Sequence, residues 1–206
     1  MSTIRQLCER VIVLDHGRIA FDGDVEEGID RYLNKKGSKK EISYDYSCYD
    51  RHPYYGRSVQ MLGIDLIDMV SNTVVLGETV GMVLHCKAYT DVHEVGFRLE
   101  ADYSDGALVG TTFLDKAFSA SSGELFDLYI NMPTDNFTPG IYNFIAVLSE
   151  KDKYGNQMVI DRVEPALTLE MEETDPESVW IHNWWGHVHF GDLILKDRKT
   201  IMSQNH

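Results

Sequence analysis

"TVGMVLHCKAY" (residues 79–89) alternates apolar and polar side chains with a period of two residues. Its apolar positions share one face, and they are Val80, Met82, Leu84, Cys86 and Ala88. The polar positions share the other face, and they are His85, Lys87 and Tyr89. Successive side chains of a strand point to opposite sides, so this pattern predicts a β-strand with one buried face.

The same alternation recurs along the rest of the chain from Val59 onward. "HEVGFRLEADY" (93–103) repeats it, and "ELFDLYINM" (124–132) places Phe126, Leu128, Ile130 and Met132 inward. "FTPGIYNFIAVLSE" (137–150) is apolar on both faces, as expected of a central strand, and its Pro-Gly-Ile-Tyr run resembles a tyrosine corner. About eight such strands with turn residues between them predict an all-β, immunoglobulin-like antiparallel β-sandwich.

The first 36 residues follow a different pattern. "STIRQLCERV" has helical spacing, residues 10–23 read as a β-hairpin, and Asp24 is placed to cap a second helix. A helix–hairpin–helix unit of this size buries little surface by itself. We therefore expect three parts: this unit (1–36), a linker and tyrosine-rich lead-in (37–58), and the sandwich (59–206).

Composition narrows the possible functions. Nineteen basic and 33 acidic residues give a formal charge of −14, which disfavours binding to the phosphate backbone of nucleic acid. Three scattered cysteines form neither a disulfide framework nor a zinc pattern. No apolar run approaches the ~20 residues that cross a bilayer, and no signal peptide is apparent, so we expect a cytosolic protein.

The first 34 residues contain four short motifs, which are Cys8-Glu9-Arg10, Asp15-His16-Gly17, Gly23-Asp24 and Tyr32-Leu33. These motifs resemble the last part of the ATPase domain of ABC exporters of bacterial polysaccharides. The segments "YYGRSVQMLGIDLID" (54–68), "VVLGETVGMVLHCKAY" (74–89) and "FTPGIYNF" (137–144) are similar to the C-terminal domain of Wzt-type subunits.

This resemblance implies a domain that binds a surface polysaccharide, such as an O-antigen, at its non-reducing end. It also implies a homodimer with an exchanged C-terminal strand, and a transmembrane exporter subunit as partner of the full-length protein. The location implied is the cytoplasm, at the inner face of the membrane.

The chain lacks a phosphate-binding G-x-x-x-x-G-K-[ST] loop, an ABC signature and an acidic Walker B strand. Without these groups it has no means to hold and hydrolyse ATP. It also has neither G-x-S-x-G nor H-E-x-x-H. We expect a binding protein without enzymatic activity and without a cofactor.

Sugar recognition combines aromatic faces for C–H groups with fixed polar groups for hydroxyls. The first candidate is "VWIHNWWGHVHFGDLIL" (179–195), from which we select Trp184, Trp185, His182 and His187. The alternative is a terminal strand whose aromatic residues fill a dimer or sheet interface. A metal site on these histidines is disfavoured, because structural zinc has four closely spaced ligands.

The second candidate is the polar face of the predicted central strands. Its residues are Tyr89, Arg98, Glu100, Asp102, Tyr129 and Asn131. The alternative is an ordinary solvated sheet face. Two other functions stay open at this point, a dimerisation module that binds no glycan and a glycan-modifying enzyme.

Overall fold

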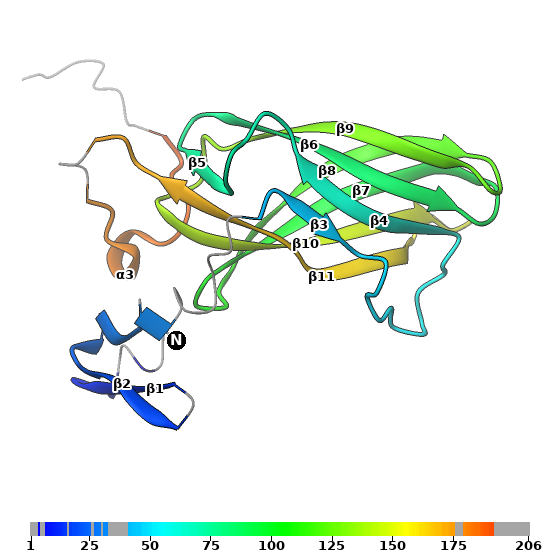
Figure 1. Cartoon of the computed structure of the whole chain (residues 1–206). Coiled ribbons are helices and arrows are strands. Elements are labelled where there is room, and N and C mark those ends of the chain that lie inside the picture. The colour runs from blue at the N-terminus through cyan, green and yellow to red at the C-terminus, as the bar shows by residue number, and fades with distance from the viewer. Residues whose placement is uncertain are drawn as a thin grey trace, which may run out of the picture.

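Two β-sheets face each other and enclose the apolar side chains that alternate along the strands (Figure 1). The computed structural model describes residues 4, 7–15, 17–25, 27–29, 31–32, 41–175 and 179–191. One sheet has the order β5 (Thr73–Val75), β11 (Gln157–Glu172), β10 (Gly140–Lys151), β7 (Val92–Tyr103), β8 (Leu108–Ala120). The other has the order β3 (Ser43–Asp45), β4 (Val59–Leu66), β6 (Thr79–Ala88), β9 (Leu125–Pro133). Within these sheets only β5 and β11 pair in parallel, so the predicted all-β sandwich is confirmed.

The predicted inward faces form the core. The five apolar positions of residues 79–89 are all buried, and so are the inward positions of β7. β10 is buried on both faces, as expected of a strand that lies between β11 and β7. On β9 the expectation of full burial is wrong for Phe126, Leu128 and Ile130, which are half-buried. Among the strands of the described residues, β9 lies at the edge of its sheet and has a neighbour on one side only, which leaves these side chains partly uncovered.

The turn before β10 has the geometry of a tyrosine corner. The hydroxyl of Tyr142 donates to the Thr138 carbonyl at 3.0 Å and accepts from the Thr138 amide at 3.2 Å. Gly140 adopts φ 139°, and a Cβ at this position would overlap the ring of Tyr103. Only glycine suits both the backbone conformation and this close approach.

The N-terminal segment contains the predicted hairpin, formed by β1 (Val11–Asp15) and β2 (Arg18–Gly23). Asp24 caps the following helical turn, because its carboxylate accepts from the Glu27 amide at 3.3 Å. Val25 and Ile29 of that helix are buried, whereas Leu33 lies outside the described residues. The division at residues 36 and 58 stays a prediction.

The tyrosine-rich lead-in closes one side of the sandwich. Tyr44, Tyr46 and Tyr49 reach from the lead-in to β11 and donate to the carbonyls of Thr168, Ala166 and Pro165 at 3.1, 2.8 and 2.8 Å. Tyr46 is only 2% exposed and belongs to the core. These contacts hold β3 and the following loop over the edge between the two sheets.

A buried ion pair fixes this closure. Arg51 Nε donates to Asp161 Oδ1 at 3.1 Å, and the two side chains are 7% and 1% exposed. The Arg51 guanidinium also donates to the carbonyls of Tyr46 and Met61 at 2.7 and 2.6 Å. The other oxygen of Asp161 accepts from the Met61 amide at 2.8 Å. The pair therefore joins the lead-in, β4 of one sheet and β11 of the other.

Replacement of Asp161 by Asn will leave the Arg51 charge buried without its counter-ion. Breaking a buried pair in this way costs about 3–5 kcal/mol, so we expect a loss of this size in the free energy of unfolding measured in urea. Lys116→Met, which removes an exposed ion pair with Glu94, is the control and should leave the midpoint unchanged. A loss below about 1 kcal/mol for Asp161→Asn would contradict the role given to the pair.

Candidate functional site

The C-terminal aromatic segment (residues 179–191) does not form the terminal strand considered from the sequence. Residues His182–Trp185 form the short helix α3, and Val188 makes a single β-bridge with Phe137. Trp184 and Trp185 are 79% and 52% exposed. Their rings therefore face solvent, as is required either for ligand contact or for an interface.

The two histidines of this segment have a different role from the tryptophans. The His187 ring stacks on Tyr103 at 4.1 Å between centroids, and His182 Nε2 lies 2.8 Å from the Pro139 carbonyl and 3.1 Å from the Tyr103 hydroxyl. Their Nδ1 atoms lie 3.0 Å apart. His182 and His187 thus anchor the segment to Tyr103 of β7 and to Pro139, the residue before β10.

The polar residues of the second candidate do not converge on one surface. Arg98, Glu100 and Asp102 lie on the outer face of the five-stranded sheet, because Phe97, Leu99 and Ala101 between them point into the core. Tyr129 and Asn131 lie on the outer face of the four-stranded sheet, opposite Val83 and Gly81 of β6. Tyr89 follows β6 and is 46% exposed, with Lys87 Nζ lying 5.1 Å from its ring centroid. The expectation of a single polar face is wrong, since both sheets have one.

The outer face of the four-stranded sheet carries a histidine between two carboxylates. His85 Nδ1 lies 2.7 Å from Asp127 Oδ1, and Nε2 lies 3.0 Å from Asp65 Oδ2. The hydrogen bond to Asp127, followed by that to Asp65, raises the pKa of His85 above its ordinary value. Tyr129, beside this group on β9, is 76% exposed, and Asn131 lines a hollow of about 560 Å³ with the loop 67–71.

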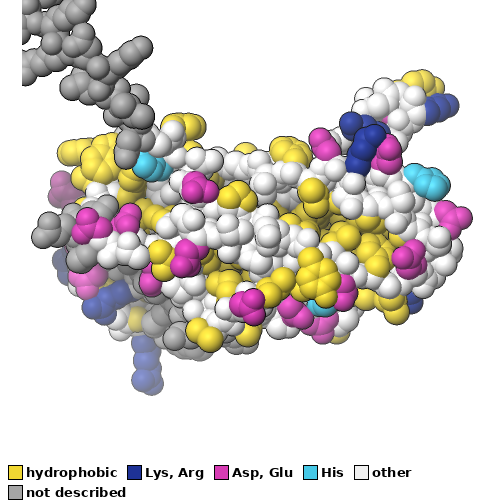
Figure 2. Space-filling view, turned by 90° about the horizontal axis from the view of Figure 1, so that it is seen from above, with side chains coloured by type: hydrophobic (Ala, Val, Ile, Leu, Met, Phe, Trp, Pro, Cys, Tyr) yellow, Lys and Arg dark blue, Asp and Glu magenta, His cyan; other side chains and the backbone are white. Residues whose placement is uncertain are grey.

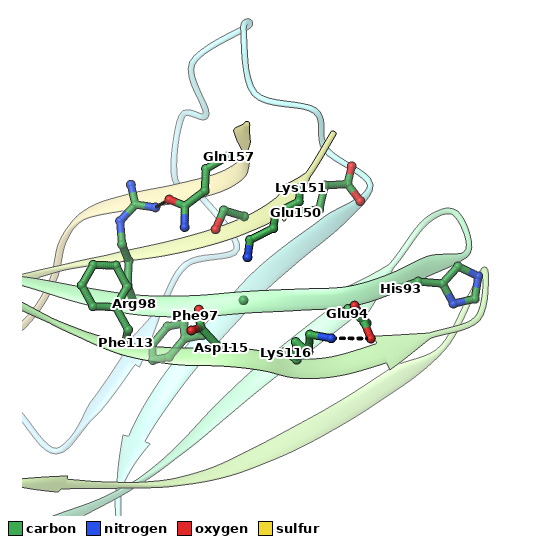
Figure 3. A pocket seen from close by; sticks show the side chains of 12 residues that line it. His93, Glu94, Phe97, Arg98, Phe113, Asp115, Lys116, Glu150, Lys151 and Gln157 are labelled. Atoms are coloured by element: carbon green, nitrogen blue, oxygen red, sulfur yellow. Dashed lines mark hydrogen bonds and ion pairs between the residues drawn. The ribbon is translucent and has the colours of Figure 1, made fainter. Parts of the chain in front are cut away.

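The outer face of the five-stranded sheet carries a polar groove, which we call the Arg98 groove (Figure 3). Arg98, Phe113, Ser149 and Gln157 line it around Gly96. Its lining also includes charged residues of both signs, namely Glu94, Asp115, Lys116, Glu150 and Lys151. Gly96 has no side chain, so the floor lies at the level of the backbone, next to the buried Ser149. Phe113 lies directly opposite Arg98 in the β7–β8 register and is 61% exposed. The groove has a volume of about 150 Å³.

Arg98 is held in place by a row of charges. Its Nε donates to Glu100 Oε1 at 2.8 Å, and Arg162 Nη1 donates to Glu100 Oε2 at 2.9 Å. Burial acts to raise the pKa of Glu100, but hydrogen bonds and charge from the two guanidinium groups outweigh it and lower that pKa. Arg98 Nη1 also lies 3.5 Å from Gln157 Oε1. The guanidinium is therefore fixed at the wall of the groove.

Such an arrangement suits binding of a polar molecule. It offers a fixed guanidinium, a carboxamide, a serine and the exposed face of an aromatic ring on one concave surface.

The sequence pattern led us to select Arg98 and Glu100, but it did not lead us to Gly96, Phe113, Ser149 and Gln157. The available signal was Gly96 inside an alternating strand, because an interior strand glycine often marks close approach by another group.

The described part of the chain contains neither of two other features, a metal site and a membrane-spanning helix. Among those residues, no group of three or more His, Cys, Asp and Glu side chains is arranged so that it could hold a metal ion. None of the helices in this part of the chain has the length and apolar character needed to cross a bilayer.

The raised pKa of His85 predicts a pH dependence. The folded state favours the charged imidazolium, so this contribution to stability is present below about pH 6.5 and is lost as pH rises through the raised pKa. We expect an NMR titration of the His85 ring to give a pKa above 6.5, and Asp127→Asn to lower it. An unchanged pKa in Asp127→Asn would contradict the assigned cause.

Comparisons with known proteins extend the description of the fold. No family model and no curated protein matches the sequence. Among solved structures, the chain is similar to the C-terminal domain of Wzt, with 14% identity, a TM-score of 0.51, and coverage of 81% of this chain and 100% of that one.

Two weaker likenesses are also found. One is to a Niemann-Pick type C2 protein from the Japanese carpenter ant, with 5% identity, a TM-score of 0.41, and coverage of 60% of this chain and 100% of that one. The other is to a CARDB domain from Pyrococcus furiosus in complex with di-metal ions, with 17% identity, a TM-score of 0.31, and coverage of 55% and 90%. Their TM-scores support no argument, so the comparisons establish one point: this chain has the fold of the Wzt C-terminal domain.

Proposed function

We propose that this chain recognises a surface polysaccharide and that the polysaccharide binds in the Arg98 groove. The observation that carries the proposal is the groove itself, where a fixed guanidinium, a carboxamide and an exposed aromatic ring surround a glycine floor. The shared fold with the Wzt C-terminal domain supports the same function.

Each part of the groove suits one feature of a sugar. The exposed ring of Phe113 offers an apolar surface for the C–H side of a pyranose. Arg98 and Gln157 provide hydrogen-bonding groups for adjacent hydroxyls, and their mutual contact limits the entropy lost on binding. A volume of about 150 Å³ is too small to enclose a free oligosaccharide. It suits one sugar of a polymer that lies across the sheet.

The wider context of the proposal is export. The N-terminal motifs, including Asp15-His16-Gly17 and Gly23-Asp24, support a chain that continues from the ATPase domain of an ABC exporter. In that setting the domain works in the cytoplasm, at the inner face of the membrane, with a transmembrane subunit as partner. Its role there is to bind the glycan and not to modify it.

Gly96 gives the sharpest test, because a side chain at this position fills the floor. The nearest atoms to its missing Cβ lie 3.7 Å away, so Gly96→Val should fold normally and block the groove. We expect calorimetry with the surface polysaccharide of the organism that encodes the chain to show binding by the unmodified chain and a loss of at least about tenfold in affinity for Gly96→Val.

Gly81→Val is the matched control, since Gly81 lies on the outer face of the other sheet, where its missing Cβ has its nearest neighbour at 3.4 Å. It should bind as tightly as the unmodified chain. Equal affinity of Gly96→Val and the unmodified chain would exclude the groove, and loss of binding in Gly81→Val alone would move the site to the sheet that carries Tyr129.

A second candidate function is a dimerisation module that binds no glycan. It is favoured by the exposure of large apolar side chains on the C-terminal aromatic segment, where Trp184 is 79% and Phe190 is 93% exposed. On this view Trp184→Ala and Trp185→Ala weaken a homodimer in sedimentation experiments and leave any glycan response unchanged. If the glycan response disappears while the sedimentation coefficient is unaltered, the tryptophans bind sugar instead.

A further inference from the structure

The sandwich is open along the side where β8 and β9 are the edge strands. The inward positions of β8 include Gly110 and Thr112, which lie opposite Ala101 and Leu99 of β7. Small or polar side chains at these positions leave the space between the sheets unfilled. Figure 2 looks onto this side, and hydrophobic side chains are visible in its hollowed middle.

The opening leads to an apolar cavity of about 560 Å³ between the sheets. Leu99, Ala101 and Phe144, none of them more than 5% exposed, line its inner part. Met132, Phe137 and Val188 line it from the side of β9 and the C-terminal aromatic segment. Core side chains thus form the inner wall of the opening.

The charge distribution favours an uncharged occupant. The chain carries a formal charge of −14, yet all of the residues that line this cavity are uncharged. A carboxylate or phosphate would gain no ion pair from the cavity, and it would lose its hydration there. A hydrocarbon chain would exchange water for core side chains, and the volume lies within the usual range of small-molecule sites.

The cavity also adjoins the Arg98 groove. Phe113 of β8 borders both of them, because β8 is an edge strand with the groove on one face and the cavity on the other. A single molecule can therefore lie in the groove with its polar part and reach round β8 with an apolar part.

We propose that the cavity binds the hydrocarbon chain of a neutral glycolipid whose sugar occupies the Arg98 groove. The second half of this statement rests on the proposed function, whereas the first half rests on the cavity alone. The ligand class is thus an uncharged sugar that carries an alkyl or isoprenoid chain.

Methyl resonances of methionine provide the test in the intact chain. Met132 lines the cavity, whereas Met61 and Met82 lie fully inside the core. On titration with octyl glucoside below its micelle concentration, we expect the Met132 methyl signal to shift while those of Met61 and Met82 stay fixed. Methyl glucoside, which lacks the chain, should bind at least about tenfold more weakly.

Gly110→Leu is the blocking variant, because no atom lies within 4 Å of its missing Cβ and a leucine there extends into the cavity. Gly81→Leu adds the same bulk on the outer face of the four-stranded sheet, away from the cavity, and is the control. The octyl glucoside response should disappear in Gly110→Leu and persist in Gly81→Leu, with both variants at least as stable to heat as the unmodified chain.

A Met132 signal that does not move, or that moves equally in Gly110→Leu, would overturn the proposal. A Met132 signal that responds to protein dilution but not to octyl glucoside would also overturn it, and would assign the opening to contact between copies of the chain. Failure of the polysaccharide to bind, with the Met132 response intact, would refute the proposed function and leave the cavity site standing.

Discussion

Arg51 and Asp161 form the contact on which closure of the sandwich depends. One guanidinium satisfies a buried carboxylate and the carbonyls of Tyr46 and Met61, and so holds an irregular segment against both sheets. A buried charge of this kind adds little stability by itself, but it allows only one arrangement of the groups around it. With this side closed by the lead-in, the opposite side, between β8 and β9, is the one that stays open. The two sides of the sandwich thus differ, because the lead-in covers one and the other opens between β8 and β9.

The outer faces differ in their chemistry, although both are polar. On the four-stranded sheet His85 is already paired with Asp65 and Asp127, so these groups hold one another. On the five-stranded sheet the charges of Glu100 and Arg162 position Arg98 beside a floor without side chains. The His85 group therefore strengthens its sheet. Arg98 uses its Nε for Glu100, and its other N–H groups, of which Nη1 also contacts Gln157, remain available to a ligand in the groove. That difference, and not the number of polar residues, favours the Arg98 groove as the binding surface.

Alternation of side chains made the sandwich and its core predictable from the sequence. The strands β6 and β7 follow the pattern closely, and each has neighbouring strands on both sides. The pattern gives the face of each side chain but not the sheet to which a strand belongs, and for this reason Arg98 and Tyr129 were assigned to one surface. The partnership of Arg51 with Asp161 joins residues 110 positions apart and leaves no periodic signal. The helix α3 was missed because its four residues are fewer than two helical turns.

Two-dimensional ¹⁵N NMR with the surface polysaccharide shows whether sugar binds in the Arg98 groove. We expect the backbone amide signals of Gly96 and Ser149 to shift on titration, while the three tryptophan indole signals keep their positions. Movement of the Trp184 and Trp185 indole signals, with those of Gly96 and Ser149 unchanged, would exclude binding in the groove.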